Sequence, residues 1–377
     1  MRKAWLALVI LIAVGSLSAS ASTSSAKNVV LRTQGYVVHI AADGSRVAVA
    51  TEFSKVNKCD RVVVWNPIKR THTKIITSVN CESGGINDIP EIALAGKRVA
   101  WLEALGGNEL ELYLRSRVLG HGKTKTIASA YNGNGAEESP DGSYLENVLG
   151  DGALLAFDSW SVCTAYPAGS DIDPSEPQCK AQAPGNKTVS RYSAQKLLKV
   201  TNDKRVEIAS APDVYASGLK TMSLTVVAVD AGRIATQQPD GSVTTYLATG
   251  RVLKKIAVPT GKFSGFALQG SQLATVRDGK LELYDVDSGT LTKTIPLAAG
   301  SALCDLQNGL AVFTQGRKIR VLRLSDGKKL TFSSPGKGSV DAQIESSGLF
   351  YSYNYKGGRS PGRVVFVPFA TLLNTLG

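Results

Sequence analysis

The hydrophobic and polar positions of residues 262–332 form one pattern that occurs twice. Residues 280–284 (KLELY) align with residues 318–322 (KIRVL), and Gly270 and Gly289 align with Gly309 and Gly327. The period is about 40 residues, as in stacked or radial repeat folds. Short segments alternate apolar and polar residues between Gly, Asp and Asn turns, without the 3.6-residue period of a helix. The pattern predicts four short β-strands per repeat.

The same unit recurs along the chain, with a glycine at the turn between its first two strands. The turn glycines are Gly44, Gly96, Gly152, Gly232, Gly270, Gly309 and Gly348. Third strands are predicted at residues 61–67, 109–115, 196–200, 242–248, 280–286, 318–324 and 363–369. One unit cannot bury its own faces, so the copies must pack radially. We therefore predict an all-β chain in which residues 22–377 form one β-propeller of seven four-stranded blades.

The two ends of the chain predict how the ring closes. The last unit stops soon after its third strand, whereas residues 28–33 (NVVLRT) form a spare strand at the start. We expect this strand to become the outer strand of the last blade, so that no sheet edge is left open.

Blade three has a longer repeat than the others. Gly152 and Gly232 are separated by two unit lengths, and residues 160–192 are rich in Pro, Ser, Asp and Gly. We interpret residues 160–192 as an insertion between the second and third strands of blade three. An eighth, degenerate blade is the alternative. Long loops on rigid scaffolds often carry function, which makes the insertion a candidate site.

Residues 1–21 have the features of a secretory signal peptide. Arg2 and Lys3 precede an apolar run at residues 4–14, and Ala19 and Ala21 supply the Ala-x-Ala cleavage pattern. The run is too short to span a membrane as a helix. We expect cleavage after Ala21 and a soluble, monomeric protein that is secreted to the extracellular space or the periplasm.

Two segments resemble the repeats of a known group of proteins. Residues 62–67 (VVVWNP) and 283–295 (LYDVDSGTLTKTI) are similar to the third strand and turn of WD40-like and YVTN-type bacterial β-propeller repeats. Trp65-Asn66 and Tyr284-Asp285 stand where such repeats carry Trp-Asp, but the Gly-His pair of eukaryotic WD40 repeats is missing. Residues 138–142 (ESPDG) resemble the Ser-Pro-Asp-Gly turn of periplasmic TolB-type propellers. The resemblance implies an exported propeller and leaves its ligand open.

Strand order predicts that basic residues gather at one end of the ring. Without Arg2 and Lys3, 41 basic residues face 31 acidic ones, a net charge of +10. First-to-second and third-to-fourth turns emerge at the same end. The candidate anion-binding residues there are Lys69, Arg70, Arg115, Arg117, Lys123 and Lys125. We expect a protein or an anionic envelope polymer as partner, and no nucleic acid, because few aromatic residues among these cations could stack on bases.

The five cysteines predict two disulfides in an exported protein. Cys59 and Cys81 flank connections at the same end of blade one, and Cys163 and Cys179 lie within the insertion. These two pairs are the predicted disulfides. Cys304 lies in an apolar first strand and is predicted to be a buried, inert thiol.

The sequence lacks the common catalytic motifs. It has no Gly-x-Ser-x-Gly elbow, no phosphate-binding Gly-rich loop and no His-Glu-x-x-His, and His39, His72 and His121 fall in separate segments. Asp171, Asp173 and Glu176 place several oxygen ligands in one short span, as a hard cation such as calcium requires. A solvated polar loop is the alternative, and no other cofactor is expected.

These observations favour an exported, non-enzymatic binding or scaffold propeller of the cell envelope or extracellular space. The alternative is a propeller enzyme that resembles lactonases or quinoproteins, which would need polar or acidic residues converging on the central channel. A structural subunit of a larger envelope complex is a third reading.

The insertion generates the first testable prediction. We expect it to be a stapled loop beside residues 131–142, with one negative patch formed by Glu137, Glu138, Asp141, Asp171, Asp173 and Glu176. Millimolar calcium should then raise the melting temperature or slow proteolysis of the loop. If neither changes, the calcium hypothesis fails.

Overall fold

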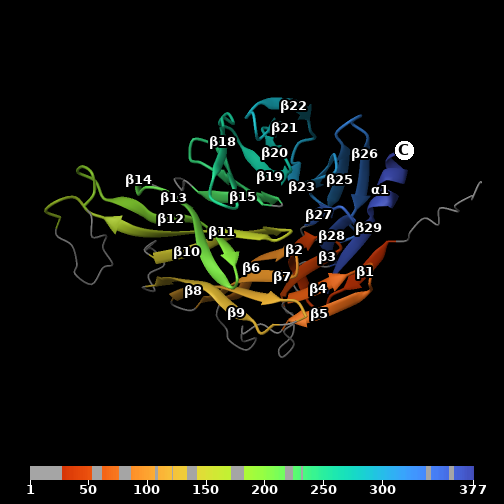
Figure 1. The fold of residues 1–377 in the computed structure, drawn as a ribbon, viewed down its shortest axis with the longest axis horizontal. Helices are drawn as coiled ribbons and strands as arrows, with labels where there is room; N and C mark the ends of the chain where they lie inside the picture. The colour runs from red at the N-terminus through yellow and green to blue at the C-terminus, as the bar shows by residue number, and fades with distance from the viewer. Residues whose placement is uncertain are drawn as a thin grey trace, which may run out of the picture.

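The computed structural model describes residues 28–52, 62–75, 86–106, 109–120, 122–133, 142–170, 182–216, 224–230, 232–336, 341–355 and 361–377. Its strands form seven antiparallel sheets, six of four strands and one of five, arranged in a ring (Figure 1). The predicted seven-bladed β-propeller is confirmed. Within the described ranges no eighth sheet is present, so the degenerate-blade alternative is not supported.

Blades one to three contain the first half of the chain. Blade one has β2 (Tyr36–Asp43), β3 (Arg46–Glu52), β4 (Val62–Asn66) and β5 (Thr71–Ile75). Blade two has β6 (Ile86–Ala95), β7 (Arg98–Gly106), β8 (Glu109–Val118) and β9 (Lys125–Gly133). Blade three has β10 (Gly142–Asp151), β11 (Leu154–Ala165), β12 (Val189–Thr201), β13 (Lys204–Ser210) and β14 (Val214–Ala216).

Blades four to seven contain the second half. Blade four has β15 (Thr225–Asp230), β16 (Arg233–Gln237), β17 (Val243–Leu247) and β18 (Val252–Ile256). Blade five has β19 (Phe263–Gln269), β20 (Gln272–Arg277), β21 (Lys280–Asp285) and β22 (Leu291–Pro296). Blade six has β23 (Ala302–Gln307), β24 (Leu310–Gln315), β25 (Lys318–Arg323) and β26 (Lys329–Ser333). Blade seven has β27 (Ala342–Glu345), β28 (Gly348–Asn354), β29 (Gly362–Pro368) and β1 (Val29–Arg32).

A short helix, α1 (Phe369–Leu376), follows the last strand of blade seven. Its Leu372 and Leu376 are buried in the apolar cluster between blades six and seven. Among the described residues, no helix has both the length and the apolar character needed to cross a membrane.

The ring closes through the N-terminal strand, as predicted. β1 pairs antiparallel with β29, with Val29 opposite Phe366 and Arg32 opposite Arg363. The Asn354 amide of blade seven accepts the Val37 N–H of blade one and donates to the Val37 carbonyl, both at 2.9 Å. The N-terminal strand therefore completes blade seven, and blades seven and one are joined by the chain that runs from β1 to β2 and by direct polar contacts.

Six of the seven predicted turn glycines occupy the turn between the first two strands. Gly44, Gly96, Gly152, Gly232, Gly270 and Gly309 have φ values between 55° and 100°, where a side chain would be strained. Blade seven differs, because its turn consists of residues 346–347 and Gly348 begins β28. A Cβ on Gly348 would lie 2.2 Å from the Val367 carbonyl oxygen, so close strand approach requires glycine there.

Apolar clusters fill the junctions between neighbouring blades. The junction of blades one and two, for example, buries Val64, Leu94 and Trp101 completely or almost completely. The junction of blades seven and one includes Phe350 and Phe366, with Val29 and Leu31 of β1 packed against them. Because each face of a blade is buried against the next blade, neighbouring blades stabilise one another.

The insertion in blade three lies between the second and third strands, as expected, but it is shorter than predicted. β11 and β12 remain paired as far as Ala165 and Val189. Residues 160–165 and 189–192 are therefore strand, and the connection comprises residues 166–188.

Aromatic side chains explain this strand extension. Tyr144 and Trp160 stack with their ring centroids 4.0 Å apart, and Trp160, Val162 and Tyr192 form a small apolar cluster. Burial of these alternating side chains stabilises strand structure in spite of the surrounding Pro- and Ser-rich composition.

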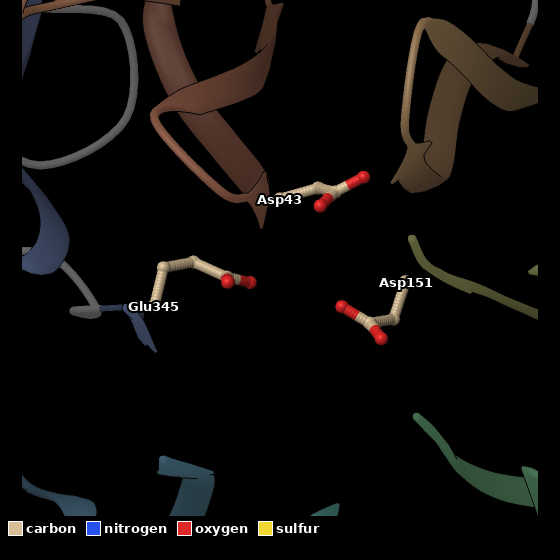
Figure 2. Close-up of side chains that lie close together, drawn as sticks. All are labelled: Asp43, Asp151 and Glu345. Carbon is tan, nitrogen blue, oxygen red and sulfur yellow. The ribbon is translucent and has the colours of Figure 1, made fainter. Parts of the chain in front are cut away.

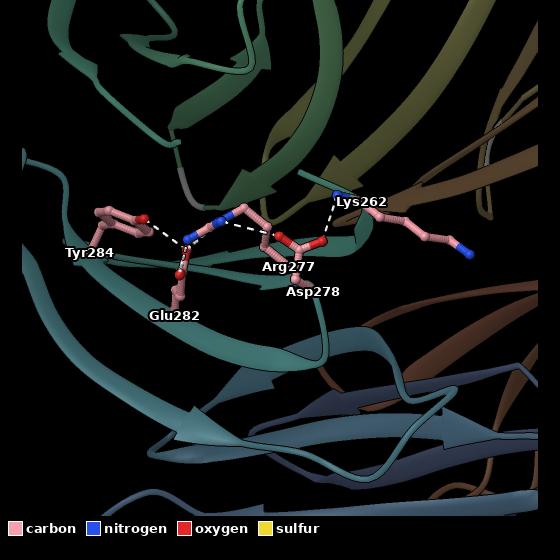
Figure 3. A network of polar contacts seen from close by, with 5 residues as sticks. All are labelled: Lys262, Arg277, Asp278, Glu282 and Tyr284. Atoms are coloured by element: carbon pink, nitrogen blue, oxygen red, sulfur yellow. Dashed lines mark hydrogen bonds and ion pairs between the residues drawn. The ribbon is translucent and has the colours of Figure 1, made fainter. Parts of the chain in front are cut away.

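Two buried glutamates interrupt the apolar interior of blades two and five. In blade five, Glu282 accepts hydrogen bonds from the Arg277 guanidinium at 2.5 and 3.1 Å and from the Tyr284 hydroxyl at 2.9 Å (Figure 3). In blade two, Glu103 accepts hydrogen bonds from Trp101 at 2.8 Å and Arg115 at 2.9 Å. Each carboxylate is paired and hydrogen-bonded, which is the condition for burying a charge.

The ring closure generates the second prediction. Deleting residues 26–35 should destabilise the whole ring cooperatively, by about 2 kcal/mol or more, because Val29 and Leu31 lose their packing and blade seven regains an open edge. The measurement is chemical denaturation followed by both fluorescence and circular dichroism. Leu31→Ser should act in the same direction, whereas Val30→Ser, at an exposed position, is the matched control. Unchanged unfolding of the truncated protein would contradict the closure.

Candidate functional site

The first strands of the blades present an unpaired edge to the central channel, and side chains of the preceding blade satisfy its N–H groups. Asp305 of blade six accepts the Ile344 N–H of blade seven at 2.9 Å. Asp341 of blade seven accepts the Ile40 N–H of blade one at 3.1 Å. These side chains replace the missing strand neighbour, because a buried N–H without an acceptor is costly.

The same device recurs at the end of the first strands. Asp43 accepts the Gly96 N–H of blade two, and Asp230 accepts the Gly270 N–H of blade five. Gln269 of blade five accepts the Asn308 N–H of blade six at 2.8 Å. A ring of acidic and amide side chains therefore surrounds the channel at the end where the first-to-second turns lie.

The channel contains a cavity of about 120 Å³. All seven first strands contribute to its walls. Its polar lining residues are Asp151, Asp230, Asp305, Gln307, Gln343 and Glu345. The walls are thus rich in carboxylates, although the protein as a whole is basic.

Three carboxylates converge at one end of the channel. Asp43, Asp151 and Glu345 end the first strands of blades one, three and seven, and one oxygen of each lies within 4.8 Å of the others. Figure 2 shows the three side chains pointing toward one another across the channel. Carboxylate oxygens without nitrogen or sulfur donors are the ligand set of hard cations, so these three residues could hold Ca²⁺ or Mg²⁺.

A proton can relieve the same repulsion without a cation. Burial raises the pKa of Glu345 to about 9, and the neighbouring Asp305 and Asp151 add to this increase. Burial likewise raises the pKa of Asp305 to about 7. At neutral pH, Glu345 is therefore protonated, which lowers the negative charge of the cluster.

A second group of buried carboxylates lies between blades two, three and four. Glu91 accepts the N–H groups of Asn147 at 2.9 Å and Val148 at 2.5 Å. Asp158 accepts the Val226 N–H at 2.9 Å, and its other oxygen has no hydrogen-bond partner in the described structure. Burial raises the pKa of both Glu91 and Asp158, so this group is also a structural acceptor set that favours the protonated form.

The predicted anion-binding residues divide into two sets. Arg115 is bound to buried Glu103 and lies over the Tyr113 ring, and Lys125 forms an ion pair of 2.7 Å with Asp203. Asp203 also binds Arg98 at 2.6 Å. Lys69, Arg70, Arg117 and Lys123 make no ion pair with any described residue. Sequence reasoning did not find the two acidic partners. Glu103, the partner of Arg115, lies inside strand β7, and Asp203, the partner of Lys125, is remote in sequence.

Several predicted site residues lie outside the described residues. These are Asp171, Asp173 and Glu176 of the proposed calcium loop, Cys59, Cys81 and Cys179, and His121. Cys163 lies in β11. Both disulfide pairings stay predictions, because the other three cysteines lie outside the described residues. Cys304 is a free cysteine beside the channel, and burial, followed by the nearby Asp341, raises the pKa of its thiol to about 12. Such a thiol is protonated and inert, as expected.

Sequence reasoning also missed Asp43, Asp151 and Glu345. Asp43-Gly44 and Asp151-Gly152 were visible as Asp-Gly turn signals. The position before the turn glycine ends a first strand and so borders the channel. That positional rule could have found two of the three residues.

The buried Glu345 generates the third prediction. Folded Glu345 keeps its proton up to about pH 9, whereas the unfolded chain releases it near 4.5. Between these values the folded state binds more protons, so this residue lowers stability as pH rises. Glu345→Gln removes this effect. The stability of the variant relative to the parent protein should therefore increase between about pH 5 and about pH 9, by more than about 1.4 kcal/mol, the value of one pKa unit. The measurement is the melting temperature of both proteins across this pH range. Glu52→Gln, at an exposed position, is the control, and a pH-independent difference for Glu345→Gln would contradict the assignment.

No protein-family model matches this chain, and no curated protein matches it. Solved structures similar to it include a chain of the mitotic checkpoint complex, with a TM-score of 0.49, 14% identity and coverage of 97% of this chain and 99% of that one. The computationally designed Ika8 protein has a TM-score of 0.48, 10% identity and coverage of 89% and 98%. Sqt1 of Saccharomyces cerevisiae has a TM-score of 0.43, 10% identity and coverage of 89% and 97%.

Proposed function

We propose that the protein is an exported, non-enzymatic binding propeller whose basic sector binds an anionic polymer of the cell envelope. The basic sector consists of exposed or half-exposed cations at the first-to-second and third-to-fourth turns of blades one and two: Arg46, Lys69, Arg70, Lys97, Arg117 and Lys123. The observation that carries the proposal is that none of these six makes an ion pair with a described residue.

Two cations at the same end of other blades are neutralised. Arg233 of blade four pairs with Asp287 at 3.3 Å, and Arg323 of blade six pairs with Asp326 at 2.5 Å. Blades one and two together therefore present six cations at this end that have no ion-pair partner among the described residues. Such a sector attracts polyanions over a distance set by the Debye length, about 10 Å at 0.1 M salt.

Export is supported by the sequence of residues 1–21, with its basic start, apolar run and Ala-x-Ala end. The bacterial, YVTN-like character of the repeats rests on residues 62–67 and 283–295. The disulfides Cys59–Cys81 and Cys163–Cys179 are part of the same proposal, since exported proteins retain such bonds.

The convergence of Asp43, Asp151 and Glu345 is the observation that favours a channel enzyme instead. The size of the channel cavity argues against this alternative. At about 120 Å³ it is smaller than pockets that enclose small-molecule ligands, which measure roughly 300–1,000 Å³. The size of the cavity therefore favours a binding surface over a catalytic channel.

The basic sector generates the fourth prediction. Changing Lys69, Lys97 and Lys123 to Glu should weaken binding of long-chain polyphosphate by about tenfold or more at low salt, because three attractive contacts become repulsive. Binding is measured by fluorescence anisotropy of labelled polyphosphate. The melting temperature should not change, since these side chains are exposed and unpaired.

The matched control changes Lys262, Lys280 and Lys318 to Glu. These exposed lysines lie at the opposite end of the ring and give the same change in net charge. The control should retain most of its affinity. Equal losses in both variants would show that net charge alone acts, and binding that persists in high salt would overturn an electrostatic sector.

A further inference from the structure

Blades two and three reach beyond the rest of the ring. β8, β11 and β12 have 10, 12 and 13 residues, whereas β20 and β21 of blade five have six each. In Figure 1 these long strands extend away from the other blades, toward the left of the view. The repeat architecture needs no strands of this length, and the cluster of Trp160, Val162 and Tyr192 accounts for only one face of the extension.

The face that blade three turns toward blade two changes character along this extension. Leu155, Phe157 and Leu198 belong to the apolar cluster between the two blades. The following alternate positions of β11, Ser159 and Ser161, are polar, and Lys196 lies opposite Ser159 in the pairing of β11 with β12. Alternate residues share one face of a strand, so the apolar contact gives way to a polar surface.

A cavity of about 440 Å³ opens where the apolar contact ends. It lies between β9 of blade two and the sheet of blade three, and we call it the inter-blade groove. The side chains used below are Ser129, Ser159, Ser161, Lys196, Arg205 and Glu207, all of which line it. Its volume falls within the range of small-ligand pockets, roughly 300–1,000 Å³.

The groove offers hydrogen-bonding groups that the protein does not use. The hydroxyls of Ser129, Ser159 and Ser161 make no hydrogen bond with any described residue. Lys196 and Glu207 form an ion pair of 2.9 Å, so their charges cancel. Arg205 has no ion-pair partner among the described residues, so the groove has one uncompensated positive charge.

A backbone irregularity maintains this arrangement. The register of β11 and β12 shifts between Ser159 and Ser161, and Ala194 in the bulge has a φ of 51°. A left-handed alanine is strained by about 1 kcal/mol or more, and β-bulges are frequent beside binding sites because they redirect side chains. Beyond the bulge Lys196 faces Ser159 across the two strands.

We propose that the inter-blade groove binds an acidic saccharide unit. Three free hydroxyls suit a ligand that itself carries several hydroxyls, since each can both donate and accept. The guanidinium of Arg205 presents parallel N–H donors that match one carboxylate. An apolar ligand would remove these polar groups from water without replacing their hydrogen bonds, which is unfavourable.

The inference is independent of the basic sector, because no residue of the groove belongs to it. The two sites can therefore be tested by separate substitutions. The full-length protein is titrated by calorimetry with trigalacturonic acid and, as the uncharged counterpart, maltotriose. We expect the acidic trisaccharide to bind at least about tenfold more tightly, since a charged hydrogen bond is stronger than a neutral one.

Substitutions separate the roles of the groove residues. Arg205→Gln should abolish the preference for the acidic trisaccharide, while Arg251→Gln, an exposed arginine on blade four, is the matched control and should leave it unchanged. Ser159→Ala combined with Ser161→Ala should weaken both sugars by about tenfold, through two lost hydrogen bonds, without lowering the melting temperature. The proposal is overturned if neither sugar binds, if maltotriose binds as tightly as the acid, or if both serine and arginine variants bind like the parent protein.

Discussion

The unpaired inner edge of the first strands is the constraint on which the rest of this structure depends. A propeller blade covers its two faces with neighbouring blades, but the strand nearest the axis has no partner on its inner side. Here Asp305, Asp341 and Gln343 each reach from one blade to an N–H group of the next. The apolar clusters hold the faces together, and these side chains join the edges, so the blades form one cooperative ring.

This constraint also determines the distribution of charge. Acceptor oxygens are needed at the channel, so carboxylates gather there, and burial, followed by crowding, raises the pKa of Asp305 and Glu345. Basic residues are left for the turns at the periphery. A protein of positive net charge therefore has an acidic axis and basic outer turns.

The sequence predicted the features that depend on local pattern. Turn glycines such as Gly44 and Gly270 need a positive φ, and alternation in residues 280–284 reveals a strand, so blade number and closure by residues 28–33 could be read directly. Features that depend on distant residues could not. Asp151 and Glu345 meet only because seven blades close a ring, and the pairing of Lys125 with Asp203 joins different blades. The strand character of residues 160–165 was hidden, since the stacking of Tyr144 on Trp160 outweighs local composition.

Variation among blades is where a repeat scaffold acquires function. Blades four to six keep short strands and pair cations such as Arg233 and Arg323 within the ring, whereas blades two and three carry long strands and the bulge at Ala194. Along β11, the apolar positions Leu155 and Phe157 that face blade two are followed by the polar Ser159 and Ser161, which line the inter-blade groove. The extension thus combines the packed cluster of Trp160, Val162 and Tyr192 on one face with a strained bulge and unused hydroxyls on the other, and the proposed binding site depends on this second face.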